Sequence, residues 1–260
     1  MSERFQLKKN VSTAVVAFVV SAILIFISYR ALISIGGIES VGIWATTLAW
    51  ASIVRFGDLG MAGASTRFVA RYDHESEVDK ILVVIETGIL SNAIINAAIT
   101  YFTYIILNNC LQFAFRDDEE LVLALNLLPY LLASQFLSNT ASAIIGVLSG
   151  LHRGYLSAYL RIGGSVFQLV LVLILVPIYD VIGLAYAQIV QFMLTTAFAW
   201  IVICKILSKK AFLPSRIHRE TFREMIGYSI FAQFSSISNG IFEPVSKIFL
   251  SLMATTEIQG

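Results

Sequence analysis

Long apolar stretches, separated by short polar segments, run through almost the whole chain. Polar and apolar positions do not alternate within them, as the run at 169–176 (LVLVLILV) illustrates. A helix needs about 20 residues to cross the hydrocarbon core of a bilayer, whereas a membrane strand needs about 10 alternating residues. The pattern therefore predicts seven membrane-spanning helices, at 11–35, 41–64, 81–107, 121–148, 157–179, 181–207 and 225–253.

The boundary between the fifth and sixth predicted helices depends on a short turn. Pro177 and Asp180 interrupt a long apolar region just before Gly183. Proline and glycine mark turns because proline ends a helix and glycine accepts unusual backbone angles. We therefore expect two antiparallel helices here rather than one long helix.

The seven predicted helices can be divided into a group of six and one further helix. The longest inner loop precedes the seventh helix, and the first and seventh helices both run into a Glu-x-x-Gly sequence, at 39–42 and 257–260. One interpretation is an internal repeat, and the other is chance similarity between short patterns. On the repeat interpretation, residues 1–207 form an N-terminal six-helix bundle, residues 208–224 a cytoplasmic linker, and residues 225–260 the first helix of an incomplete second bundle. The chain then resembles a truncated piece of a longer transporter.

Composition excludes an ordinary soluble domain. Hydrophobic residues make up 57% of the chain and charged residues 13%, against about 25% charged residues in a typical globular protein. Such a chain lacks the polar residues to cover a water-facing surface. The net charge of +1 gives no reason to expect a nucleic-acid partner.

The distribution of lysine and arginine predicts the orientation. If the N-terminus lies inside, 14 of these residues fall in inner segments and one, Arg116, in an outer loop. Cytoplasmic loops of membrane proteins are enriched in lysine and arginine. We therefore expect a multi-pass protein of the cell membrane with its N-terminus in the cytoplasm, which argues against a seven-helix receptor.

Three local sequences carry a family resemblance. They are FGDLGM at 56–61 followed by RFVARY at 67–72, GVLSGLHR at 146–153, and the Glu-x-x-Gly helix entry. Together with the hydropathy pattern they resemble the O-antigen (Wzx-type) flippases of the multidrug/oligosaccharidyl-lipid/polysaccharide exporter superfamily. The resemblance implies an all-α, polytopic, MATE-like membrane helix bundle.

The resemblance also implies a function. Such a protein flips an oligosaccharide, linked through pyrophosphate to a polyprenyl lipid, from the cytoplasmic to the outer leaflet of the bacterial inner membrane by alternating access. The product serves O-antigen or capsule synthesis. The implied partners are this lipid-linked oligosaccharide, membrane lipids and a coupling ion, H⁺ or Na⁺. No cofactor and no enzymatic activity are implied.

Ionisable residues inside the predicted helices are the candidate substrate contacts, because charges are rare and usually functional within a membrane. Cations would attract the pyrophosphate, and carboxylates would balance them or bind the coupling ion. With one asparagine from the polar part of the seventh helix, the candidates are Arg30, Arg55, Asp58, Glu86, Asn239, Glu243 and Lys247.

Each charge also has a structural interpretation. The long Arg30 side chain can reach the outer head groups, and Glu86 lies near enough to the inner surface for simple exposure. The remaining charges are spaced to neutralise each other along a helix. They form the pairs Arg55 with Asp58 and Glu243 with Lys247.

The seventh helix has a second unusual feature. Pro244 removes a helical hydrogen bond, and the segment at 233–240 before it is rich in serine, asparagine and glutamine. Broken polar helices at mid-depth are typical of transporter binding sites. The alternative is hydrogen bonding between helices through small polar residues.

Regularly spaced glycines favour close helix packing at the inner ends of helices. Closure of an inner gate is the alternative interpretation. The two sets are Gly146, Gly150 and Gly154, and Gly57, Gly60 and Gly63.

Other functions fit less well. An ion-coupled drug or cation antiporter of the same superfamily would favour a cavity rich in carboxylates, whereas the predicted intramembrane charges are balanced. An integral-membrane glycosyltransferase or polymerase would need a longer catalytic loop, and a non-transporting scaffold leaves these charges unexplained. The basic residues of the inner segments, Arg153 and Arg161 among them, are explained by topology and by contact with anionic lipids.

Overall fold

The structure is a computed structural model that describes residues 3–54, 60–75, 77–115, 117–207 and 214–240, together with Val245 and Ile248. The side chains of 3–8 and 231–240 lie outside this description. No strand occurs in the part described. The elements are α1 (Glu3–Ala51), α2 (Met61–His74), α3 (Val78–Cys110), the short 3₁₀ helix η2 (Leu111–Phe113), α4 (Asp118–Gly150), α5 (Gly154–Tyr179), α6 (Val181–Ile206) and α7 (Arg219–Gly240).

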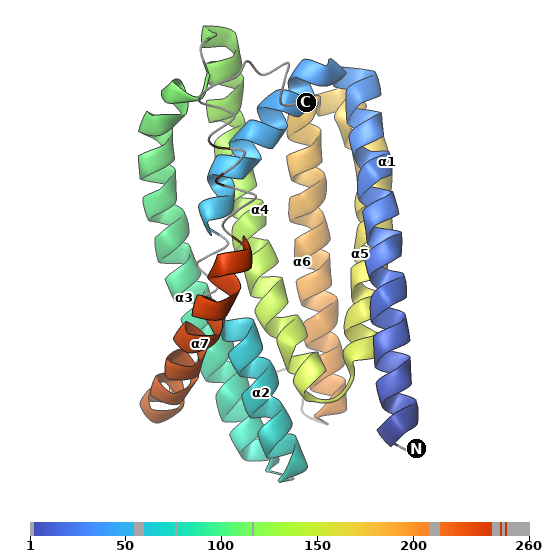
Figure 1. Cartoon of the computed structure of the whole chain (residues 1–260), viewed down its shortest axis with the longest axis vertical. Coiled ribbons are helices and arrows are strands. Elements are labelled where there is room, and N and C mark those ends of the chain that lie inside the picture. The colour runs from blue at the N-terminus through green and yellow to red at the C-terminus, as the bar shows by residue number, and fades with distance from the viewer. Residues whose placement is uncertain are drawn as a thin grey trace.

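The helices form one elongated bundle (Figure 1). The first residues of α1 and the C-terminal ends of α2, α4 and α6 lie at one end of it. The turns between α3 and α4 and between α5 and α6 lie at the other end. Five described segments are long and apolar enough to cross a membrane. The predicted all-α membrane helix bundle is thus confirmed, while the cytoplasmic orientation of the N-terminus stays a prediction.

The third to sixth predicted helices agree with α3 to α6 within three residues at every end. The turn between α5 and α6 is as short as expected, since only Asp180 separates them. The Gly183 N–H donates to the Asp180 carbonyl at 2.9 Å. A Cβ at Gly183 would clash with the Leu175 carbonyl, so glycine lets the two helices begin their antiparallel course side by side.

The first two predicted helices are joined at a kink. In α1, Gly37 has φ 79° and ψ 174°, a backbone conformation that residues with a Cβ rarely adopt. After this kink the chain turns back and crosses the bundle obliquely (Figure 1). The kink therefore replaces the polar loop that the sequence suggests between the two helices.

The prediction of one uninterrupted helix over 41–64 was wrong. Helix α1 ends at Ala51, residues 52–54 form a 3₁₀ turn, and α2 begins only at Met61. Gly60, just before α2, has φ 74° in the left-handed region. This conformation cannot continue a right-handed helix, so the second membrane crossing consists of two helical pieces.

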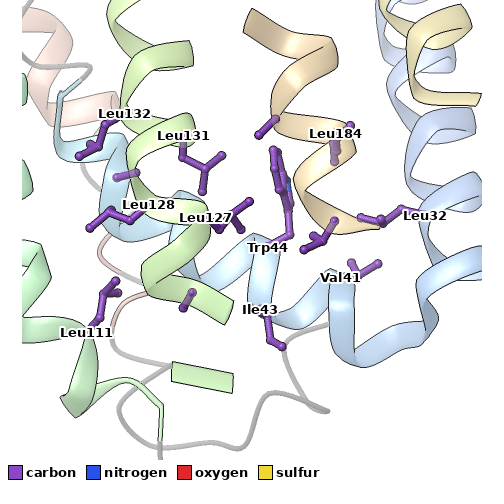
Figure 2. Close-up of a cluster of buried hydrophobic side chains, with 14 of the residues drawn as sticks. Leu32, Val41, Ile43, Trp44, Leu111, Leu127, Leu128, Leu131, Leu132 and Leu184 are labelled. Atoms are coloured by element: carbon purple, nitrogen blue, oxygen red, sulfur yellow. The ribbon is translucent and has the colours of Figure 1, made fainter. Parts of the chain in front are cut away.

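Two apolar clusters hold the bundle together, one toward each end. The first is built around Trp44, which is fully buried among leucines of α4 and α6, including Leu127, Leu131 and Leu184 (Figure 2). The Trp44 Nε1–H donates to the hydroxyl oxygen of Tyr29 at 3.3 Å. The second cluster joins α2, α3, α4, α6 and α7 through the side chains of Met61, Ile85, Val147, Ile203 and Met225.

Helices α2 and α4 touch backbone to backbone. A Cβ at Gly146 would lie 2.6 Å from the Ala62 carbonyl oxygen, and one at Gly150 would lie 2.7 Å from the Thr66 carbonyl oxygen. The Thr66 hydroxyl donates across this contact to the Gly146 carbonyl at 2.9 Å. The predicted close packing is confirmed at these two glycines. Gly63 is different, because a Cβ there would meet no atom within 4 Å.

The seventh predicted helix begins earlier than expected. Helix α7 starts at Arg219 rather than at residue 225, and it packs beside α2 and α3. The Arg67 guanidinium lies 4.3 Å from the centre of the Tyr228 ring across this contact. Its described part ends at Gly240, so Pro244 and the predicted break around it lie outside the described residues.

Candidate functional site

A polar layer separates the two apolar clusters. Along α4, buried leucines at 127–132 are followed by polar residues and then by buried apolar residues at 144–148. Helix α6 shows the same sequence of apolar, polar and apolar residues. The polar residues of this layer on the two helices include Ser134, Ser138, Asn139, Ser142, Gln188, Gln191 and Thr195. Polar groups gathered between membrane helices are typical of a binding site or of an internal hydrogen-bond network.

Part of this layer surrounds a cavity of about 730 Å³ among α1, α2, α4, α5 and α6. Nine hydroxyl side chains, three glutamines and one arginine line it, together with several apolar residues. No carboxylate occurs among the lining residues that the structure describes. The polar lining is thus almost entirely uncharged.

Hydrogen bonds hold some of this lining in place. The hydroxyl oxygens of Ser21 on α1 and Ser165 on α5 lie 3.1 Å apart. The Ser134 hydroxyl, just outside the cavity, donates to the Gln188 side-chain oxygen at 3.3 Å. Other lining groups, such as the Gln191 amide, have no hydrogen-bond partner in the described part of the chain. They are free to bind the hydroxyl groups of a ligand.

Among the described lining residues, the one that carries a charge is Arg161 on α5. It shares a helical face with Ser165 and Gln168, four and seven residues further on, which also line the cavity. No carboxylate among the described residues pairs with its guanidinium. Arg161 is itself exposed and lies near the start of α5, as expected for a residue beside an inner loop. Its place in the cavity wall is not predicted from the sequence.

The broken second crossing adds a further source of positive potential. Ala62, Gly63 and Thr66, in the first two turns of α2, line the cavity. Gly60 provides no side-chain cap for this helix end. The first N–H groups of a helix have no partner within the helix and carry a positive partial charge. The first turns of α2 and Arg161 thus line the same cavity.

Three buried asparagines lie on the other side of α4, between α3 and α4. The Asn139 amide donates to the Val54 carbonyl at 3.0 Å and to the Asn96 side-chain oxygen at 3.1 Å. Asn92 donates to the Asn139 carbonyl at 3.4 Å. The hydrogen bond to Val54 joins the asparagines of α3 and α4 to the 3₁₀ turn that follows α1. This network therefore has a structural role among these elements.

Two of the predicted substrate contacts have described side chains, and neither lines the cavity. Arg30 lies on α1, exposed, and is absent from the cavity wall. Glu86 lies on α3, where its Oε2 is 3.9 Å from Nε2 of His218. The backbone N–H of His218 donates to the Thr87 hydroxyl at 3.2 Å, so this contact ties the start of α7 to α3. The structure therefore does not bring Arg30 and Glu86 together.

The other predicted contacts cannot be placed. Arg55, Asp58, Glu243 and Lys247 lie outside the described residues, and so does the side chain of Asn239 on α7. Among the described residues, the buried polar side chains are serines, threonines and asparagines, without any charged residue. The buried polar groups in this part of the chain are therefore uncharged.

Known structures share this architecture. An outward-facing multidrug resistance MATE family transporter of the MOP superfamily superposes with a TM-score of 0.73 at 18% identity, covering 91% of this chain and 54% of that one. An inward-facing structure of such a transporter gives 0.62 at 19% identity, covering 92% and 55%. A MOP superfamily transporter from Pyrococcus furiosus, described by a binding pocket of reverse polarity, gives 0.68 at 18% identity, covering 90% and 54%.

These similarities establish the fold, and the chain spans about half the length of the transporters it matches. No curated protein sequence matches it. Residues 7–260, almost the whole chain, match the family of polysaccharide biosynthesis proteins. The predicted family relationship is confirmed: the chain belongs to the polysaccharide biosynthesis protein family and has the fold of MATE transporters of the MOP superfamily.

Proposed function

We propose that this chain is part of a flippase that moves a lipid-linked oligosaccharide across the bacterial inner membrane for O-antigen or capsule synthesis. The observation that carries the proposal is the described lining of the cavity, which combines hydroxyl and amide groups with one arginine. Membership of a polysaccharide biosynthesis family supports it. Because the chain spans about half of the transporters it resembles, the activity proposed is that of the whole protein.

The chemistry of such a substrate matches this lining. Sugar hydroxyls both donate and accept hydrogen bonds, as do the serine, threonine and glutamine side chains of the cavity. A phosphate would accept charge-assisted hydrogen bonds from Arg161. Leaving a charged group unpaired in hydrocarbon costs many kcal/mol. A polar cavity with a cation therefore lowers the barrier to moving the head group across the membrane.

The predicted charged contacts keep a place in this proposal. Arg55 and Lys247 would attract the pyrophosphate along the rest of the path, with Arg30 nearer the outer surface. The carboxylates of Asp58, Glu86 and Glu243 would balance these charges or bind the coupling ion, H⁺ or Na⁺. The transport cycle would be alternating access, with the N-terminus in the cytoplasm.

A drug or cation antiporter with the same fold is the second candidate. It would favour carboxylates in the cavity, because a cationic substrate needs a negative partner. The described lining has an arginine and no carboxylate. We therefore prefer an anionic, sugar-bearing substrate.

The test is the leaflet position of the lipid-linked oligosaccharide in cells that lack the gene. Spheroplasts are treated with a glycosidase that cannot cross the membrane, and the cleaved fraction of the oligosaccharide is measured. We expect that fraction to fall strongly without the gene and to return when the full-length gene is supplied. Normal cleavage without the gene, or restored cleavage by an unrelated membrane protein, would contradict the proposal.

A further inference from the structure

A second hollow lies beside the polar cavity, on the other side of the contact between α5 and α6. It is a groove of about 450 Å³. Its walls are apolar and aromatic, with Leu160 and Phe167 on α5 and Leu194 and Phe198 on α6. None of the described residues that line it is charged. Both helices are long and apolar enough to span a membrane, so a hydrocarbon chain is a suitable occupant for an apolar groove between them.

The groove and the cavity share part of one wall. Gln191 and Thr195 on α6 line both spaces. Opposite them on α5 is Gly164, where a Cβ would lie 2.9 Å from the Thr195 hydroxyl oxygen and 3.4 Å from the Gln191 amide nitrogen. The absence of a side chain at Gly164 thus leaves a thin partition made mainly by two side chains. Arg161 lies one turn before Gly164 on α5 and lines the polar side.

Adjacent polar and apolar spaces fit a molecule with a polar and an apolar part. We propose that the groove between α5 and α6 holds the polyisoprenyl tail of the lipid-linked substrate, while the phosphate lies by Arg161 and the sugars enter the cavity. This inference rests on the proposed function and adds a tail site to it. Gln191 and Thr195 then border the point where head and tail meet.

An attached tail is a better occupant of this groove than a free lipid chain. Within a bilayer the hydrophobic effect does not favour a protein groove over the surrounding lipid, since both are apolar. A tail tethered to a head group in the cavity is different, because the tether raises its local concentration at the groove. Preferential occupation should therefore depend on the head group.

Photo-crosslinking in the full-length protein tests this dependence. A photoreactive phenylalanine analogue replaces Phe198, or Phe167 as a second reporter, and Phe26 on the exposed face of α1 is the control position. The radiolabelled probes are polyprenyl phosphate, polyprenol without phosphate, and phosphatidylglycerol. We expect polyprenyl phosphate to label the groove positions several-fold more than position 26, and the other two probes to show no such preference. The tail site would be overturned if polyprenyl phosphate labelled the groove positions and position 26 equally. It would also be overturned if phosphatidylglycerol labelled the groove positions with the same preference.

A variant that fills the groove gives a second measurement. A Cβ at Gly163 would meet no atom within 4 Å, so Gly163→Leu adds bulk to the groove without a clash at the Cβ. We expect this variant to abolish preferential labelling of position 198, while Gly163→Ala retains it. Undiminished labelling in Gly163→Leu would also contradict the proposal. If the oligosaccharide is flipped while labelling is uniform, the tail site is wrong and the flippase function stands. If the groove positions are labelled preferentially in a protein that flips no oligosaccharide, the tail site stands and the flippase function is refuted.

Discussion

Arg161→Ala is expected to slow polysaccharide export strongly while the protein still accumulates in the membrane. Arg161 is the only charged residue described in the cavity wall. A hydrogen bond to a charged group contributes about 1.5–3 kcal/mol. If this interaction is made while the head group crosses the membrane, its loss slows transport by about 10- to 100-fold. The measurement is the rate at which labelled oligosaccharide becomes accessible at the outer surface.

Two further variants make this result specific. Arg161→Lys retains the positive charge without the forked geometry of the guanidinium, so we expect an intermediate rate. Arg153→Ala removes an exposed arginine that is absent from the cavity wall, and it should leave transport near the wild-type rate. Equal losses in Arg161→Ala and Arg153→Ala would show that general basic charge matters rather than the cavity.

Gly146→Leu is expected to lower the stability of the bundle strongly. The new Cβ would lie 2.6 Å from the Ala62 carbonyl oxygen and 3.2 Å from the Thr66 hydroxyl oxygen, so α2 must move away from α4. Overpacking of this kind typically costs 1–3 kcal/mol. For a domain of this size, each 1 kcal/mol corresponds to about 2–4 °C in the midpoint of thermal unfolding. Thermal unfolding of the purified protein in detergent measures the effect.

The matched control is Gly163→Leu, which makes the same chemical change in open space on α5. We expect its unfolding midpoint to stay close to the wild-type value, apart from the small gain in helix propensity when glycine is replaced. If both leucine variants unfold at the same temperature, the close contact between α2 and α4 is not a major source of stability.

Most of the helices could be predicted because the membrane restricts the choice of structure. Every backbone polar group must find a partner in the absence of water, so a long apolar run has to form a helix. The ends of α3 to α6 follow from polar or turn-forming residues such as Asp118, Gly154 and Asp180. The tight contacts of Gly146 and Gly150 were also predictable from their spacing.

The break in the second crossing was missed because one glycine pattern has two meanings. Gly60 and Gly63 were interpreted as packing residues, like Gly146 and Gly150. In the structure Gly60 is left-handed and Gly63 lines the cavity. Glycine spacing alone cannot separate close packing from a backbone break, because both depend on the missing side chain.

The polar cavity is not predicted by the charged residues of the sequence. The polar side chains of its lining are mainly serine, threonine and glutamine, which are common throughout the chain and carry no charge. A signal was nevertheless present in the helical spacing of Arg161, Ser165 and Gln168 and of Gln188, Gln191 and Thr195. Such a polar stripe on two neighbouring membrane helices predicts a shared polar interface. The sequence alone does not show that α1 and α2 complete it.

Reaction of a cysteine inside the cavity tests the central claim, that this space is hydrated and holds the sugars. Ser142→Cys is introduced into the full-length protein after Cys110 and Cys204 are replaced by serine, with Phe26→Cys on exposed α1 as the control. A hydrophilic thiol reagent should modify Cys at position 142 and not at position 26, and the lipid-linked oligosaccharide should slow that modification. No reaction at position 142, or a rate that the oligosaccharide leaves unchanged, would contradict the claim.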